Sequence, residues 1–218
     1  MRVMSTPAKS KRAAPSGAER LDGACAVKSA KAGAADLLRQ AVFKMKTRRF
    51  GALAEILVQK ITGCSAPDSI FYDLYDQSSK KRLEVKFSTV LHAHKTPVRL
   101  DTLEQVLREA LDEDRAVEFS DWQRTSWGCN IQQVKPAEFD VLVYGLFFAD
   151  KVLLFKRDAK DVASMEGYCE KQHKGNVGEG QFTLAPKNFA RHLRQALYMT
   201  LSYEDLAELL LPTQTSKA

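Results

Sequence analysis

Apolar residues recur at two different spacings along the chain, and the spacing predicts which segments are helices and which are strands. Between about Ala35 and Thr62 they recur every three or four residues, which is typical of a helix in one or two pieces, with Gly63 as its expected stop. In residues 69–75 and 82–88, polar residues alternate with aliphatic, aromatic or β-branched ones. Because turn-forming residues separate these two segments, the pattern predicts a β-hairpin with a loop over residues 76–81.

The second half of the chain adds further helices and strands. We expect a capped helix from Asp101 to about Leu111, strands over residues 139–148 and 152–155, a short helix from about Asp158, and closing helices over residues 186–199 and 202–212. Residues 139–148 are almost entirely apolar, which is typical of a strand whose sheet is covered on both faces. This order of elements predicts an α/β fold with a mixed central sheet flanked by helices.

The positive charge of the chain is concentrated at its start. The sequence has 33 Lys and Arg against 27 Asp and Glu, a formal net charge of +6. Residues 1–33 hold seven basic and two acidic side chains, so they carry +5 and the rest of the chain carries +1. These residues are rich in Ala, Ser, Lys and Gly and show no apolar periodicity. We therefore expect a flexible basic tail over residues 1–33 and one folded domain over residues 34–218.

The composition argues against a membrane-spanning protein and against a zinc finger. The longest apolar run, from Val141 to Ala149, is far shorter than the roughly 20 residues that a transmembrane helix needs. The four cysteines include no CxxC pair. We expect an intracellular, cytoplasmic protein with no membrane partner, although the basic tail also permits a nuclear or organellar address.

The predicted hairpin brings three charged residues onto one face. If its loop is centred on residues 78–79, Asp73 lies directly opposite Glu84, and Lys86 falls on the same face, while the other face collects apolar residues. Two carboxylates that face each other repel, so their pairing requires a compensating cation. A divalent ion such as Mg²⁺, which binds carboxylates, backbone oxygen and water, meets this requirement.

Spacing alone leaves two other interpretations of these residues open. A solvated hairpin face, on which Lys86 neutralises the two acids, explains the pattern about as well as a metal site does. Asp76 is a rival ligand. It lies an odd number of residues from Asp73 and should point away from the acids, unless a bulge shifts the register.

Glu55 is an unusual acid in the predicted first helix. It projects nearly opposite the apolar stripe expected to face the core, which contains Leu53, Ile56 and Leu57. Its neighbours on its own side are small or apolar and would let a second element approach closely; they include Gly51, Ala54 and Val58. A plain surface face would more often carry Lys and Glu.

The hairpin also resembles a known family. Asp73, followed after ten residues by Glu84, Val85 and Lys86, is similar to the motif of the PD-(D/E)XK nucleases. Residues 50–56, 130–148 and 171–182 resemble segments of small type II restriction endonucleases, so the resemblance covers about residues 49–211. It implies the PD-(D/E)XK fold and a Mg²⁺-dependent, sequence-specific endonuclease that hydrolyses double-stranded DNA and leaves 5′-phosphates.

The resemblance implies a role for each matching residue. Asp73 and Glu84 would be metal ligands, and the Val85 carbonyl would add a third oxygen. Lys86 would position or deprotonate the attacking water. Glu55 is similar to the helix acid that many members add as an outer group or as a ligand of a second metal. A cognate DNA methyltransferase is the implied functional partner, and a homodimer is compatible with the family.

Amide and basic side chains gather in two later segments. Side chains of these types read base edges or hold phosphates, so we expect DNA contacts from Gln132, Gln133, Gln172, His173, Lys174, Asn176 and Gln181. A polar surface loop is the alternative interpretation. Trp122 and Trp127 could stack on bases, but packing against the protein is the expected role of both.

Two other functions fit the same sequence. A repair or junction-resolving nuclease of the same fold would cut DNA by its structure instead of its sequence. A non-catalytic DNA-binding protein would keep the fold without the chemistry, and the presence of all three of Asp73, Glu84 and Lys86 argues against it.

Overall fold

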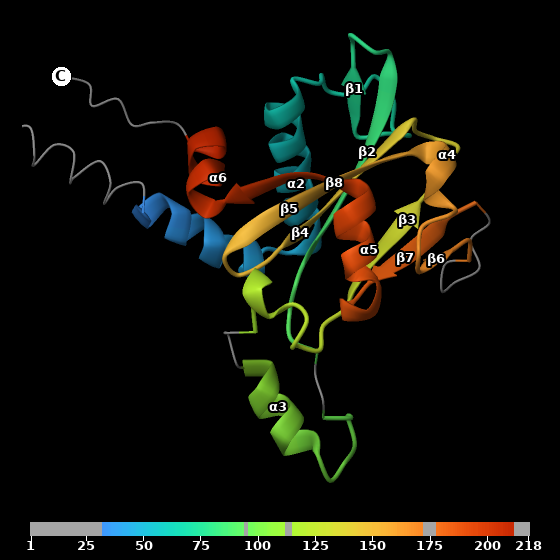
Figure 1. Cartoon of the computed structure of the whole chain (residues 1–218). Helices are drawn as coiled ribbons and strands as arrows, with labels where there is room; N and C mark the ends of the chain where they lie inside the picture. Colours follow the sequence, from blue (N-terminus) through green and yellow to red (C-terminus); the bar gives the residue numbers. More distant parts are fainter. Residues whose placement is uncertain (1–31, 94–95, 112–114, 172–177, 212–218) are drawn as a thin grey trace, which may run out of the picture.

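A computed structural model describes residues 32–93, 96–111, 115–171 and 178–211. Within these residues, the centre is a five-stranded sheet in which β2 and β4 run parallel and every other neighbouring pair is antiparallel (Figure 1). The strands lie in the order β1 (Leu74–Asp76), β2 (Lys81–Thr89), β4 (Val141–Phe147), β5 (Lys151–Asp158) and β8 (Leu197–Ser202). The chain therefore has the predicted α/β class, with a mixed central sheet.

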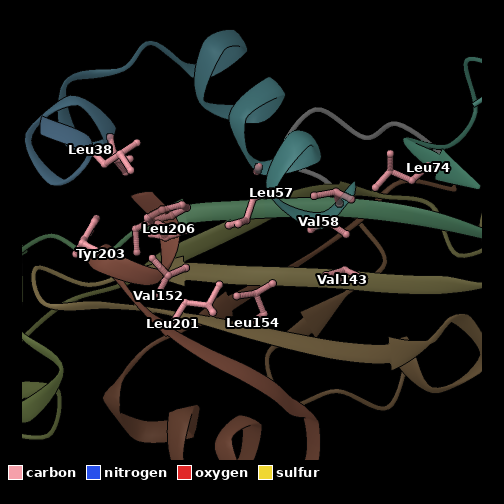
Figure 2. Packing of buried hydrophobic residues seen from close by; sticks show 14 of the residues in the cluster. Leu38, Leu57, Val58, Leu74, Val143, Val152, Leu154, Leu201, Tyr203 and Leu206 are labelled. Carbon is pink, nitrogen blue, oxygen red and sulfur yellow. The ribbon is translucent and has the colours of Figure 1, made fainter. Parts of the chain in front are cut away.

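Helices cover one face of this sheet. They are a helix over residues 32–44, α2 (Thr47–Thr62) and α6 (Tyr203–Leu210). Their buried side chains pack against the sheet in a single apolar core. Figure 2 shows this core, in which helix residues meet strand residues that include Val143, Val152, Leu154 and Leu201.

A second, smaller sheet and the helices α4 (Ala159–Val162) and α5 (Pro186–Ala196) cover the opposite face. In the described residues this sheet has the strand order β3 (Cys129–Val134), β7 (Gly180–Leu184) and β6 (Tyr168–Cys169). A second apolar core fills the space between these elements and the central sheet. The remaining elements are a single 3-10 turn at Phe119–Asp121 and α3 (Leu103–Leu111), which projects away from both sheets in Figure 1.

Every residue of β4 is buried, because alternate side chains of this strand enter the two cores. This confirms the prediction of a strand covered on both faces. Gly145 lies where no side chain fits: a Cβ atom there would lie 2.0 Å from a ring carbon of Phe87, its neighbour in β2. The glycine therefore makes room for the Phe87 ring on the strand that also carries Glu84 and Lys86.

The first strand of the hairpin is shorter than the alternation predicts. Strand pairing starts at Leu74, and residues 69–73 bend instead of extending. The Ser69 hydroxyl accepts a hydrogen bond of 3.3 Å from the Phe71 N–H. Such side-chain bonds compete with strand pairing, so the prediction of a strand over residues 69–73 is wrong.

The predicted helix over residues 186–199 is also too long. α5 ends at Ala196, and Leu197 begins β8, which pairs with β5 at the edge of the sheet. Pairing with a strand distant in the sequence overrides the local helical pattern here. Ser202 caps α6 as expected, since its hydroxyl accepts a hydrogen bond of 3.1 Å from the Asp205 N–H.

The structure contains both the divided first helix and the short helix after β5 that the sequence predicts. Residues 1–31 of the predicted tail lie outside the described residues, and residues 32–33 already belong to the helix over residues 32–44. The long helical pattern is indeed split in two, and the short helix expected from Asp158 is α4. Among the described residues, no helix combines the length and the apolar character needed to cross a bilayer.

Candidate active site

The β1–β2 hairpin has the register that the sequence predicts. Leu74 pairs with Leu83, and the paired residues run from there to the turn. Asp73 lies just before β1, and its N–H donates a hydrogen bond of 2.9 Å to the Leu83 carbonyl, so the predicted pairing of Asp73 with Glu84 is not formed. Val85 points into the helix-covered core, so its two neighbours in β2 face the smaller sheet. The hairpin thus presents its acids on the side of β3.

Lys86 lies between the two carboxylates. Its Nζ is 3.7 Å from Asp73 Oδ2 and in direct contact with Glu84 Oε1. Asp73 Oδ2 also accepts a hydrogen bond of 2.8 Å from the Val85 N–H. β1 begins only at Leu74, so β2 has no strand partner at Val85 on this edge. The Asp73 carboxylate accepts the Val85 N–H there instead. The three charged groups predicted to share one face are therefore together.

Glu84 is the most buried of the three, with 8% of the residue exposed. Burial raises the pKa of Glu84 to about 7, the Lys86 ammonium opposes this rise, and the Asp73 carboxylate adds to it. The carboxyl group therefore changes its protonation close to neutral pH. Shifted pKa values of this kind cluster at functional sites, although structural ion pairs also produce them.

Glu55 lies on α2 within electrostatic reach of the same group. Burial raises the pKa of Glu55, the charge of Asp73 raises it further, and the charge of Lys86 lowers it. Glu55 itself is half-buried. The structure therefore places this acid close enough to the hairpin to sense its charges.

The buried side of α2 differs from the stripe that the sequence predicts. Ala54, Leu57 and Val58 are buried, whereas Ile56 is 49% exposed. The predicted stripe is therefore wrong at Ile56. Ala54 and Val58 do face another element, as the sequence indicates, because α2 packs on β2. The Cβ direction of Gly51 meets no atom within 4 Å, so the prediction of a close approach there is wrong.

Asp76 belongs to the hairpin turn. Its Oδ1 accepts a hydrogen bond of 2.9 Å from the Ser78 N–H, and its Oδ2 accepts one of 2.5 Å from the Ser79 hydroxyl. These bonds hold the pKa of Asp76 well below its usual range. The contacts of this acid are thus with the turn and not with the group around Lys86.

A cleft with a volume of about 220 Å³ opens over the charged group. Asp73, Glu84 and Lys86 line it, and β3 contributes Gln133 to its wall. Gln133 has a φ of 57° in a bulge of β3. Such a backbone is uncommon for a residue other than glycine, and strained positions of this kind cluster at functional sites.

Sequence reasoning missed the other residues that line the cleft. Lys135 Nζ lies 3.5 Å from Glu138 Oε1 and 3.4 Å from Glu179 Oε1, and all three residues line the cleft. The spacing of Lys135 and Glu138 indicates a local ion pair, but nothing in the sequence links them to the hairpin. Ile70 and Phe71 also line the cleft, and the alternating pattern had assigned them to a strand.

The donor atoms at the open end of the hairpin fit a hard divalent ion. Asp73 and Glu84 supply carboxylate oxygens. The N–H and C=O of Val85 point to the same edge of β2, and its N–H already bonds the Asp73 carboxylate, so its carbonyl lies on that edge too. Mg²⁺ binds such oxygens together with water. No three His, Cys, Asp or Glu side chains gather as a metal site in the described part of the chain.

The residues expected to contact DNA fall on two surfaces. Gln133 lines the cleft, whereas Gln132 and Gln181 lie on strands of the smaller sheet. Gln181 accepts a hydrogen bond of 3.2 Å from Asn130 Nδ2 and donates one of 3.3 Å to the Lys171 carbonyl. The alternate residues of β3 and β7 are buried, so these amides lie on the outer face of that sheet. Four of the predicted residues lie outside the described residues: Gln172, His173, Lys174 and Asn176.

The two tryptophans pack against the protein, as expected. Trp127 is 3% exposed, and its Nε1 donates a hydrogen bond of 2.8 Å to the Trp122 carbonyl. Both indole rings pack edge-on against the Phe189 ring, with centroid distances of 5.1 Å for Trp122 and 5.2 Å for Trp127. Their burial against one phenylalanine accounts for both residues.

Comparison with known proteins adds no relative to this picture. The sequence matches no protein-family model and no curated protein sequence.

Proposed function

We propose that this chain is a Mg²⁺-dependent endonuclease of the PD-(D/E)XK type that cleaves double-stranded DNA at a short specific sequence. The carrying observation is the cross-strand group of Asp73, Glu84 and Lys86 at the base of an open cleft. A solvated hairpin face is a poorer explanation, because Glu84 is only 8% exposed. Burying Glu84 beside a second carboxylate costs stability, which favours a functional reason for the arrangement.

In the proposed reaction each residue of the group has one task. Asp73, Glu84 and the Val85 carbonyl would hold Mg²⁺, and the bound ion would supply positive charge to polarise the phosphate and stabilise the leaving oxygen. Lys86 positions the attacking water through Nζ. It can take the proton of that water only in its neutral amine form, because an ammonium has no lone pair. Cleavage of the bond to the 3′ oxygen leaves a 5′-phosphate.

The smaller sheet supplies the proposed recognition surface. Its outer face carries neighbouring amides from β3 and β7, among them Asn130, Gln132 and Gln181, and its bulge directs Gln133 into the cleft. Amides bind the edges of bases in the DNA grooves, so a row of them next to the cleft would couple sequence reading to cutting. A cognate methyltransferase and assembly as a homodimer complete the proposal as a type II restriction enzyme.

Mapping of the cut sites tests the proposal. Several unrelated plasmids are digested with the purified chain and Mg²⁺, and the ends are read by run-off sequencing. We expect discrete fragments that share a short sequence at their ends. Cleavage confined to branched or mismatched DNA would make the chain a structure-specific nuclease. Binding without nicking at any protein excess would make it a non-catalytic DNA-binding protein.

Glu55→Gln tests whether α2 contributes to the site. If Glu55 orients ligands or waters around the metal, this variant should cleave about 10- to 100-fold more slowly at limiting Mg²⁺ and need more Mg²⁺ for half-maximal cleavage. Mg²⁺ titrations of the cleavage rate measure both quantities. The matched control is Glu204→Gln, an exposed acid on α6. An unchanged Mg²⁺ dependence in a folded Glu55→Gln variant would remove Glu55 from the site.

A further inference from the structure

Two large apolar side chains stand exposed at the rim of the cleft. Ile70 is 95% exposed and Phe71 is 57% exposed, yet both line the same cleft as Asp73 and Glu84. Isolated exposed apolar residues are ordinary on a protein surface. Two adjacent ones at the rim of a cleft that Asp73 and Glu84 also line offer a contact surface to a partner that is apolar and lies close to these acids.

The backbone on both sides of this pair is held in place. Before it, the Ser69 hydroxyl binds the Phe71 N–H at 3.3 Å. After it, Tyr72 is buried and its hydroxyl binds the Asp68 carboxylate, while the Asp73 N–H donates a hydrogen bond of 2.9 Å to Leu83. The two side chains therefore project from an anchored segment, and little ordering is needed before they contact a ligand.

The chemistry of a bound nucleic acid supplies such a partner. When a phosphodiester lies over Asp73 and Glu84, the bases attached to it are the nearest apolar surfaces of the substrate. Aromatic rings stack on any base, and Phe and Ile are among the side chains that enter a base stack and kink a duplex. We propose that Ile70 and Phe71 form a wedge that opens the base stack of the bound duplex next to the scissile phosphate. This inference rests on the proposed function.

A duplex with 2-aminopurine beside the mapped cut site reports on stacking. With Ca²⁺ in place of Mg²⁺, binding of the wild-type chain should raise the 2-aminopurine fluorescence, because an unstacked base is less quenched. The double variant Ile70→Ser/Phe71→Ser should bind with little or no rise. With Mg²⁺ it should cleave the intact duplex about 10- to 100-fold more slowly than the wild type.

Two further substrates and variants separate a wedge from a structural role. A duplex with an abasic site at the same step is already unstacked, so the double variant should recover most of the lost rate on it. Phe71→Leu keeps an apolar side chain and should retain more activity than Phe71→Ser. The matched control is Leu100→Ser, which alters a 94% exposed leucine near α3 that does not line the cleft; it should behave as the wild type.

The outcomes are distinguishable. The wedge would be overturned if the wild type cleaved DNA but gave no rise in fluorescence. It would also be overturned if the double variant cleaved the intact duplex as fast as the wild type does. In both cases the proposed function would stand. Absence of any cleavage by the wild type would overturn the proposed function, and the wedge with it. An equal loss of rate on intact and abasic duplexes would assign Ile70 and Phe71 a structural role instead.

Discussion

Lys86→Ala is expected to reduce DNA cleavage by at least about 100-fold while DNA binding survives. The Lys86 ammonium contacts one carboxylate and lies 3.7 Å from the other, so its removal takes away the cation that orients water beside them. About a quarter of the Lys86 side chain is exposed, and it lines an open cleft. Single-turnover cleavage and a gel-shift measurement of binding give the two quantities.

The same loss is expected for Asp73→Ala and Glu84→Ala, because each removes a proposed metal ligand. Asp76→Ala is the matched control: this acid is three residues from Asp73, yet its contacts are with the turn. It should cleave within a few-fold of the wild type once folded. Full activity in Asp73→Ala together with loss in Asp76→Ala would show that the wrong acid has been assigned.

Glu84→Gln should abolish cleavage and at the same time stabilise the metal-free protein at alkaline pH. The folded chain holds the pKa of Glu84 at about 7, above the ordinary value of 4.5, so the folded state binds this proton more tightly than the unfolded state does. The free energy of unfolding of the wild type therefore falls as the pH rises from about 4.5 to 7. A pKa shift from 4.5 to about 7 corresponds to a loss of up to about 3 kcal/mol. Glutamine does not titrate, so the variant is spared this loss.

Unfolding in denaturant, measured with EDTA from pH 4 to pH 8.5, checks this expectation. The free energies of unfolding of the wild type and Glu84→Gln should nearly agree at pH 4 and diverge through neutral pH. Glu204→Gln, which changes an exposed acid, should follow the wild type throughout. Mg²⁺ should then stabilise the wild type more than Glu84→Gln, since binding to the folded state adds to stability. Parallel curves at every pH would mean that Glu84 is not destabilising when charged.

The chemistry of the hairpin could be predicted from the sequence because its determinants are local. Strand alternation has a period of two, and a loop of turn-forming residues fixes the register, so the pairing of Leu74 with Leu83 follows from the sequence. That pairing leaves Asp73 at the end of the hairpin, where its carboxylate and that of Glu84 both lie close to the Lys86 ammonium. Two of the small or apolar residues beside Glu55 likewise indicated the packing of another element on α2. Each of these conclusions depends on neighbours in the sequence.

The rest of the cleft could not be predicted, because its walls come from distant segments. Lys135 and Glu179 lie next to the ends of β3 and β7, and the alternation within these short strands does not indicate that their sheet packs beside the hairpin. The sequence pattern predicts helix where β8 begins, because pairing with β5 overrides the local helical preference there. The bends before Asp73 are accompanied by side-chain hydrogen bonds of Ser69 and Tyr72, which periodicity does not register.

The parallel pairing of β2 with β4 has a consequence for how such a chain can diversify. Parallel neighbours require a crossover, and here residues 90–140 form it, with α3, β3 and the bulge at Gln133 on the way. The entropy of closing such a connection grows slowly, by only about 0.6 kcal/mol for each doubling of its length. Insertions, deletions or exchanges in the crossover can therefore accumulate while β2 keeps Glu84 and Lys86. Selection could reshape what surrounds the cleft, and so what enters it, without passing through forms that have lost the strand on which Glu84 and Lys86 lie.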